Sequence, residues 1–253
     1  MNAIILAAGY ATRLYPLTLN KAKPLLEIAG RPIIDWMLQA IRGVSELKTI
    51  FVVTNSKFAN DFQHWADRQD PLCRKRLKII NDGSTSDDDK LGAIGDINLV
   101  ITREDVAATP LVVLAGDNLL DQSLIEFVRF ARNTFAAVGV YDVGDLDKIK
   151  NYGNVVIDAE GTITYFEEKP QKPRSTLAAI GIYYYSPTAL SLITTYLAAG
   201  NNPDQPGRFV QWLYQRKPVK AFQITGRWLD VGSKETLEQA TKILRKSQPN
   251  LSI

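Results

Sequence analysis

The stretch Ala3–Leu14 reads AIILAAGYATRL, an apolar run that passes into small residues and then into a cation. Such a run is typical of a buried strand, and the alanines and glycine after it let a backbone approach a ligand closely. Exposed N–H groups in a turn of this kind can cradle phosphate oxygens. The stretch therefore predicts a first strand followed by a nucleotide-binding loop that contains Leu6, Ala7, Ala8, Gly9 and Thr12.

Two cations follow, Arg13 at the end of this stretch and Lys23 in Lys23-Pro24-Leu25-Leu26. A guanidinium group can neutralise phosphate through a bidentate fork, and an ammonium group adds a compact point charge. We therefore expect Arg13 and Lys23 to act on the phosphates of a nucleoside triphosphate bound at the start of the fold.

Composition limits the class of protein and of partner. The chain has 253 residues, 45% of them hydrophobic and 23% charged, which is ordinary for a globular protein. A formal net charge of +3 without a clustered basic face predicts no nucleic-acid partner. No segment approaches the roughly eighteen apolar residues of a membrane span, and no signal peptide opens the chain. We expect a soluble cytoplasmic protein with no membrane partner, and a homo-oligomer is left open.

Histidine and cysteine are nearly absent from the chain. Cys73 is the single cysteine and His64 the single histidine, so an internal disulfide and a histidine metal cluster are excluded. A Ser-His or Cys-His catalytic arrangement would have to use His64, which lies in a helical pattern. Any bound metal must therefore be held by oxygen ligands, which predicts Mg²⁺ or a similar hard cation.

Strand and helix patterns alternate through the first half of the chain. Apolar runs at 3–7, 47–53, 77–80 and 111–115 are separated by helical patterns that begin at Pro32 and cover 56–68 and 91–102. Such alternation is typical of a parallel sheet covered on both faces. After about residue 136 the strand patterns come closer together, which indicates hairpins. They cover residues 136–141, 153–157, 163–166 and 178–185, followed by helices at 187–197 and 207–216, strands at 219–224 and 228–231, and a helix from Ser233 to about 246.

We therefore predict an α/β fold, a Rossmann-like three-layer α/β/α arrangement with a mostly parallel, mixed central sheet. The chain shows no linker, internal repeat or low-complexity tract, so residues 1–253 are interpreted as a single domain. Its nucleotide-binding half would cover residues 1–135, and residues 136–253 would hold the second substrate and end in the final helix.

Two carboxylates stand beside apolar strands. Asp117 directly follows the run 111–115, and ligands of open α/β sheets bind beyond the carboxyl ends of the strands. Asp230, in Trp228-Leu229-Asp230-Val231, is costly to bury unless it is paired or bound to a metal. Together they could supply two oxygen ligands to Mg²⁺, with phosphates and water completing the octahedron. A turn or helix-cap role for Asp117 and a structural ion pair for Asp230 are the alternatives.

Two polar motifs flank strands of the second half. Tyr152-Gly153-Asn154 opens a strand, and Glu167-Glu168-Lys169-Pro170 ends one. Strand neighbours point to opposite faces, so either member of a Glu-Lys pair could enter a site, unless a bulge re-aims both. An exposed charged strand end is the alternative. Upstream, residues 82–90 are typical of a mobile polar loop, and Gly92 precedes small residues that could admit a flat base.

Taken in order, these motifs closely resemble those of the sugar-phosphate nucleotidylyltransferases, over about residues 1–245. The resemblance implies that the opening loop, Arg13 and Lys23 carry the triphosphate, and that Asp117 and Asp230 bind catalytic Mg²⁺. It implies a sugar-phosphate site made of Tyr152, Gly153, Glu168, Lys169 and Tyr183, with Arg208 as a looser match to a phosphate contact. Asn81 lies near the position where thymidylyltransferases use a glutamine to read the base.

Some positions depart from the family pattern. Ala11 stands at the second glycine of the Gly-x-Gly-Thr-Arg loop, and Ala22 replaces the proline that often precedes the lysine. Neither change removes a charged group, so catalysis is expected to survive. The departure at Asn81 and the inserted stretch 84–89 weaken the assignment of the base, for which UTP or dTTP is favoured over GTP by a small margin.

The resemblance implies a Mg²⁺-dependent transfer in which a sugar 1-phosphate attacks a nucleoside triphosphate to give a nucleotide sugar and pyrophosphate. An ionised phosphate needs no general base, so positioning and charge neutralisation suffice. One alternative is transfer from CTP to phosphocholine, with Trp212, Trp228 and Tyr183–Tyr185 as an aromatic cage. Another is a non-catalytic nucleotide-sugar sensor. A nicotinamide-dependent oxidoreductase is disfavoured, because the opening loop lacks G-x-G-x-x-G.

Overall fold

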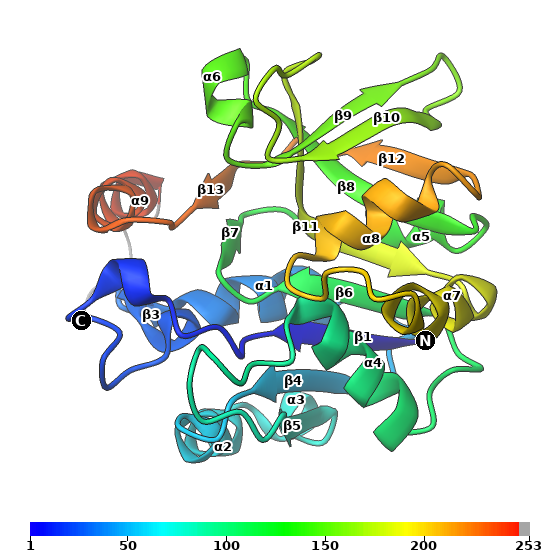
Figure 1. Ribbon diagram of the computed structural model, residues 1–253. Coiled ribbons are helices and arrows are strands. Elements are labelled where there is room, and N and C mark those ends of the chain that lie inside the picture. The colour runs from blue at the N-terminus through cyan, green and yellow to red at the C-terminus, as the bar shows by residue number, and fades with distance from the viewer. Residues whose placement is uncertain (248–253) are drawn as a thin grey trace.

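The computed structural model describes residues 1–247, and its centre is a nine-stranded mixed sheet (Figure 1). Four strands are parallel, in the order β5 (Leu77–Asn81), β4 (Ile50–Thr54), β1 (Asn2–Leu6) and β6 (Leu111–Ala115). β11 (Leu177–Tyr185) joins β6 in the antiparallel sense and also pairs with β8 (Ala136–Asp142) and β9 (Gly153–Ile157). β10 (Ile163–Glu168) then pairs with β9, and β12 (Val219–Gln223) with β8. The predicted mixed sheet with a parallel core is confirmed.

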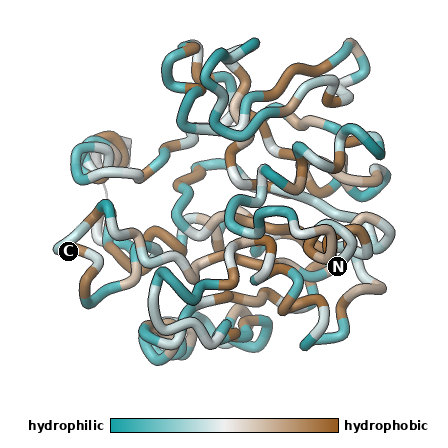
Figure 2. Tube along the Cα trace, viewed as in Figure 1, coloured by the Kyte–Doolittle hydropathy of each residue, from teal (hydrophilic) through white to brown (hydrophobic). Residues whose placement is uncertain are grey.

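Helices cover both faces of this sheet. One face packs against α1 (Ile33–Arg42), α2 (Ala59–Asp67) and α5 (Ile125–Ala131). The other packs against α4 (Ala93–Arg103), α7 (Pro187–Ala198) and α8 (Pro206–Leu213). Alternate residues of β1 serve the two cores, because successive strand side chains point to opposite faces: Ala3 and Ile5 face one, Ile4 the other. The three-layer arrangement follows, with apolar residues concentrated along the central strands (Figure 2).

Short elements complete the fold, and of these the sequence pattern predicts only the strand over 228–231. β7 (Asn118–Leu120) pairs antiparallel with β13 (Trp228–Asp230), and β2 (Glu27–Ile28) with β3 (Arg31–Pro32). A third core that includes Ile28, Trp36 and Leu244 joins the β2–β3 hairpin to α9 (Lys234–Ser247). The remaining pieces are single turns: α3 (Pro71–Arg74), α6 (Leu146–Ile149), and the 3₁₀ turns η1 (Thr12–Leu14) and η2 (Lys23–Leu25).

The predicted ranges differ from the structure mainly at their ends. The helix predicted over 56–68 begins at Ala59, because Asn55 accepts a hydrogen bond from the Phe58 N–H and forms a turn first. The helix predicted over 91–102 begins at Ala93, and the strand predicted from residue 47 begins at Ile50. His64 is exposed on α2. Over the described residues, every helix is too short or too polar to cross a membrane.

Candidate active site

A cavity of about 290 Å³ opens at the carboxyl ends of β1, β5 and β6. Open α/β sheets bind ligands at this edge, where loops leave the strands. The lining brings together the following predicted residues: Leu6, Ala7, Ala8, Gly9, Lys23, Gly92 and Asp117. The loop after β1, the 3₁₀ turn η2 and the turn after β6 therefore meet around one space.

The loop after β1 is fixed by backbone contacts and leaves its small residues facing the cavity. The Ala7 N–H donates to the Val53 carbonyl at 2.8 Å, and the buried Asn55 amide donates to the Ala8 carbonyl at 2.9 Å. Ala11 has a φ of 48°, in the left-handed region, where a residue with a Cβ costs about 1–2 kcal/mol. The alanine that departs from the family pattern therefore keeps the backbone that a glycine would adopt.

Lys23 and Asp117 form an ion pair at one end of the cavity. Lys23 Nζ lies 2.8 Å from Asp117 Oδ2, and the lysine side chain is only 11% exposed. Gly116 lets the turn before Asp117 lie close to β1, because a Cβ there would lie 2.7 Å from the Leu6 carbonyl oxygen. The Gly116 N–H donates to that same carbonyl, which holds the start of the turn against β1. A largely buried cation thus lies beside a carboxylate in the same cavity lining as the loop after β1.

The β7–β13 pairing brings Asp230 to the same place. Asp230 lies opposite Asn118 in the register, next to Asp117 in the chain. Asn118 is buried, donates to the Ile180 carbonyl and accepts from Trp228 Nε1, so it anchors both short strands to β11. Two carboxylates more than a hundred residues apart are therefore neighbours.

The electrostatics of this pair fit a hard divalent cation. Burial raises the pKa of Asp230, and the charge of Asp117 raises it further, while Lys23 and Arg13 lower it. Carboxylates that repel one another in this way are stabilised by a cation between them. No group of three or more metal-ligating side chains occurs within residues 1–247. Asp117 and Asp230 would therefore hold Mg²⁺ together with substrate phosphate and water.

Tyr152 links the second half of the chain to these carboxylates. Its hydroxyl donates to Asp230 Oδ2 at 3.1 Å, and its ring packs on Trp228 with the centroids 5.2 Å apart. Burial and the charge of Asp230 raise the pKa of Tyr152 well above its ordinary value, so the hydroxyl remains a donor. The tyrosine of the Tyr-Gly motif therefore helps to hold the Asp230 carboxylate in place.

Glu168 occupies a notch between two glycines. A Cβ on Gly207 would lie 1.9 Å from Glu168 Oε2, and one on Gly153 would lie 3.1 Å from it. Burial raises the pKa of Glu168, while the charges of Lys169 and Arg208 lower it. Lys169 follows with a φ of 52°, so β10 ends at Glu168 and strict strand alternation stops there. Lys169 itself is exposed.

Three more predicted residues lie on η1 and β11. Like Asp230, Tyr152, Gly153, Glu168 and Lys169, they are not among the residues that line the cavity. Thr12 and Arg13 are exposed on η1, although the charge of Arg13 reaches Asp230. Tyr183 is buried in β11, stacked on Tyr185 with the ring centroids 6.2 Å apart. Burial and the charge of the neighbouring Glu168 raise the pKa of the Tyr183 hydroxyl.

Arg208 and Asn81 also lie away from the cavity. Arg208 lines a separate polar cavity beside Trp212 and Arg216 on the α8 surface. The Asn81 side chain accepts hydrogen bonds from Ser56 and from the Gly83 N–H. The residue after it, Asp82, lines the cavity in its place.

The sequence analysis missed the carboxylates at the end of the cavity away from Lys23. Asp82, Asp96 and Asp204 line that end, on segments that the chain order separates widely. The only local signal was a charged residue in the otherwise apolar first turns of the helix 93–103, which a surface position explains equally well. Tertiary packing alone brings these residues together.

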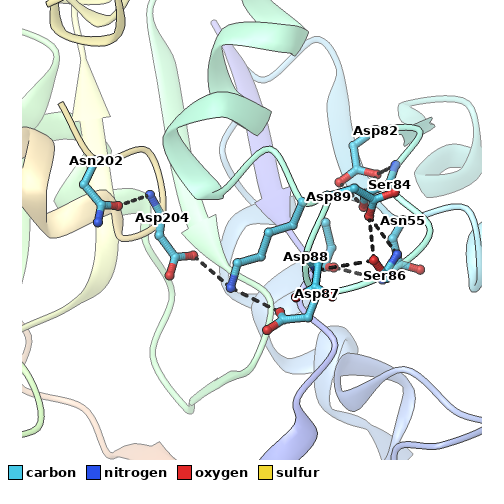
Figure 3. A network of polar contacts seen from close by, with 11 residues as sticks. Asn55, Asp82, Ser84, Ser86, Asp87, Asp88, Asp89, Asn202 and Asp204 are labelled. Carbon is cyan, nitrogen blue, oxygen red and sulfur yellow. Dashed lines mark hydrogen bonds and ion pairs between the residues drawn. The ribbon is translucent and has the colours of Figure 1, made fainter. Parts of the chain in front are cut away.

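The stretch 84–89, part of the loop predicted to be mobile, forms a compact turn that follows Asp82 (Figure 3). Asp89 accepts from the Thr85 hydroxyl at 2.7 Å and from the N–H groups of Ser86 and Thr85 at 2.8 and 3.0 Å, and these bonds lower its pKa to about 2. Lys90 then pairs with Asp87 and with Asp204. The stretch is tied to the connection before α8.

The aromatic residues considered for a quaternary-ammonium cage do not gather around one space. Trp228 packs against Tyr141 and Tyr152. Trp212 instead stacks on Phe209, with the Arg216 guanidinium carbon 4.1 Å from its ring centroid. The cage proposed for a phosphocholine acceptor is therefore not assembled from this set.

Comparison with known proteins shows the family to which the chain belongs. A family model described as nucleotidyl transferase matches residues 2–247. The chain belongs to this family. A UTP–glucose-1-phosphate uridylyltransferase of Haloferax volcanii, AglF, is 27% identical over 250 residues, which cover 97% of each chain. The mannose-1-phosphate guanylyltransferase catalytic subunit beta of Drosophila pseudoobscura pseudoobscura is 29% identical over 237 residues, 91% of this chain and 59% of that protein.

The fold of this family member is confirmed by a solved structure. A UDP-glucose pyrophosphorylase complexed with UDP-glucose matches with a TM-score of 0.82 and 21% identity, over 97% of this chain and 98% of that one. The chain spans only 54% to 59% of the length of several curated relatives that it matches.

Proposed function

We propose that this nucleotidyl transferase joins a nucleoside triphosphate to a sugar 1-phosphate and releases pyrophosphate. The observation that carries the proposal is that the loop after β1 and the Lys23–Asp117 pair line one cavity, with Asp230 close enough to Asp117 for their charges to interact. A buried cation and two carboxylates beside a phosphate loop suit a reaction limited by charge neutralisation. Relatives that transfer uridylyl and guanylyl groups to sugar phosphates support the same reaction class.

In this reaction the triphosphate lies against the N–H groups of the loop, with Arg13 neutralising its outer charge. An oxygen of the sugar phosphate attacks the α-phosphorus, the bond to the bridging oxygen breaks, and pyrophosphate leaves. Lys23 holds the phosphates in line, and Lys169 acts on the acceptor side. Mg²⁺ held by Asp117 and Asp230 would neutralise charge on the triphosphate. No side chain needs to remove a proton.

The nucleotide and the sugar are the finer part of this proposal. The sequence resemblance favours UTP or dTTP, and this preference stays a prediction. A non-catalytic nucleotide-sugar sensor would bind these ligands without turnover, but it would have no use for a lysine–aspartate pair beside a second carboxylate. We therefore propose an enzyme, folded as a single domain whose second half holds the sugar phosphate.

Pyrophosphate release tests the reaction directly. The wild-type chain is expected to release pyrophosphate with at least one pair from a panel of UTP, dTTP, GTP, CTP and ATP against several sugar 1-phosphates and phosphocholine. Arg13→Ala is expected to lower kcat/KM by about 100-fold, because a charge-stabilising donor is lost. Arg129→Ala removes an exposed arginine of α5 and serves as the control. Near-normal turnover in Arg13→Ala, or binding of every pair without pyrophosphate, would sink the assignment.

The acceptor side is tested by filling the notch of Glu168. Gly207→Ala is expected to raise the KM for the sugar phosphate at least fivefold and to leave the KM for the nucleotide unchanged. The new methyl group must displace Glu168 Oε2, and overpacking of this kind costs about 1–3 kcal/mol of stability. Gly43→Ala, which meets only the end of Ile125, is the matched control. An unchanged KM for the sugar phosphate would show that Glu168 is not part of the sugar-phosphate site.

A further inference from the structure

Five aspartates line the nucleotide cavity: Asp82, Asp87, Asp96, Asp117 and Asp204. Four of them have donors. Lys23 pairs with Asp117 at one end, and Lys90 stands between Asp87 and Asp204 at the other (Figure 3). The Ser84 N–H and hydroxyl donate to Asp82, both at 2.8 Å. The fifth, Asp96, differs.

Asp96 lies in the first turn of α4 and is only 4% exposed. Its Oδ1 atom is buried and has no hydrogen-bond partner among the described residues. Burial, followed by the charge and hydrogen bond of Asp82 and the charge of Asp204, raises the pKa of Asp96 to about 8. A buried acceptor left without a donor is unfavourable, and such groups cluster at binding sites. The hydrogen bond with Asp82 leaves Oδ1 without a donor, and because Asp96 lines the cavity, a ligand could supply that donor.

The position of Asp96 in the cavity indicates which part of the ligand it meets. Lys23, Asp117 and the loop after β1 occupy the opposite end and suit the phosphates. On the proposed function, on which this inference rests, the base then lies at the end formed by Asp82, Asp96 and Asp204. That end offers carboxylate oxygens, and its one lysine is held between two aspartates.

We propose that Asp96 recognises guanine, accepting hydrogen bonds from the ring N1–H and the exocyclic amino group. Guanine carries these two donors side by side, and a carboxylate can accept both. Uracil and thymine present a single N–H between two carbonyl oxygens, and those oxygens would face the carboxylates of Asp82 and Asp204. Cytosine and adenine present an amino group beside a ring nitrogen that accepts. The carboxylates of Asp82, Asp96 and Asp204 thus favour guanine over the base of UTP or dTTP, the nucleotides that the sequence resemblance favours.

Because of this contact, the binding of guanine is coupled to the release of a proton from Asp96. The two-donor edge of guanine needs the ionised carboxylate, so below about pH 8 binding releases the proton of Asp96 to solvent. Affinity for GTP then rises by up to about tenfold per pH unit and levels off above pH 8. The charged groups facing Asp96 are Asp82 and Asp204, with Lys90 between Asp204 and Asp87. β1 and α7 carry no charged residue, and Arg208 of α8 is exposed and bonded to Gln205.

Calorimetric titration without an acceptor tests the contact separately from turnover. Wild-type chain is titrated with GTP, ITP, UTP and dTTP in the presence of Mg²⁺ at several pH values between 6 and 9. We expect GTP to bind at least tenfold more tightly than UTP or dTTP, with release of a proton at pH 7. ITP, which lacks the amino group, is expected to bind about tenfold more weakly than GTP.

Two matched variants isolate Asp96. Asp96→Asn keeps the size of the side chain but offers one donor and one acceptor, so GTP affinity is expected to fall at least tenfold and its pH dependence to vanish. XTP, which carries a carbonyl where guanine has its amino group, is expected to gain affinity in this variant. Asp88→Asn removes an exposed charge from the loop between β5 and α4 and should behave as wild type. Thermal unfolding verifies that both variants fold.

The outcomes separate the two proposals. Equal or tighter binding of UTP or dTTP, or an unchanged pH slope in Asp96→Asn, would overturn the guanine contact. Pyrophosphate release from UTP with a sugar phosphate would do the same while upholding the reaction. If GTP binds as expected but no acceptor yields pyrophosphate, the contact stands and the proposed function fails. Absence of binding by every nucleotide overturns both.

Discussion

Asp117→Asn is expected to slow pyrophosphate release by at least about 100-fold at saturating substrates. The substitution keeps the shape of the side chain but removes one of the two carboxylates that would hold Mg²⁺. It also leaves Lys23, which is 11% exposed, without its ion-pair partner at 2.8 Å. Excess Mg²⁺ should recover little of the rate, because the lost ligand also positions the lysine. Steady-state pyrophosphate release across a Mg²⁺ titration measures both effects.

A matched variant separates this effect from a general change of charge. Asp105→Asn removes a carboxylate from an exposed left-handed position that asparagine tolerates well. It is expected to keep the wild-type rate and Mg²⁺ dependence. If Asp117→Asn retained more than about a tenth of the rate, the ion pair would be structural and the metal would have to lie elsewhere.

The central strands and the helices between them are predictable because their patterns are local. In β1 every residue but the last is buried, and such a continuous apolar run fits a strand covered on both faces. The loop after β1 and Asp117 could be placed at the cavity for the same reason, since both follow such a strand. Here the position in the sequence already implies the position at the sheet edge.

The residues that complete the site could not be placed in this way. β7 has only three residues, and its partner β13 lies more than a hundred positions further along, so no local period marks either as a pair. The cost of burying a charge in an apolar strand marks Asp230 as a candidate site residue, but its position beside Asp117 depends on the pairing of β13 with β7. Asp96 resembles a surface position of an amphipathic helix until the connection before α8 covers it. Non-local packing, rather than propensity, decides these positions.

Gly92→Ala is expected to be the most damaging small substitution near the base end, lowering stability by about 2–4 kcal/mol. Gly92 has a φ of 77° and a ψ of 158°, a region that only glycine occupies readily. A Cβ there would lie 2.7 Å from the Pro203 carbonyl oxygen and 2.9 Å from the Asp204 Cα. These are backbone atoms and cannot rotate away. Thermal unfolding and the KM for the nucleotide are the measurements.

Gly83→Ala separates the two causes of this damage. Gly83 also has a positive φ, of 87°, but a Cβ there would meet nothing within 4 Å, so this variant carries backbone strain alone. It is expected to lose about 1 kcal/mol. At the start of α4 the Ile94 N–H donates to the Pro203 carbonyl and the Ala93 N–H donates to the Asp204 carbonyl. The additional loss of stability in Gly92→Ala then measures how firmly this contact holds the two segments together. Equal losses of stability in the two variants would mean that the connection before α8 moves aside without cost to make room for the new methyl group. Asp204 would then not be held against the base end, and one of the two charges that raise the pKa of Asp96 in addition to its burial would be lost.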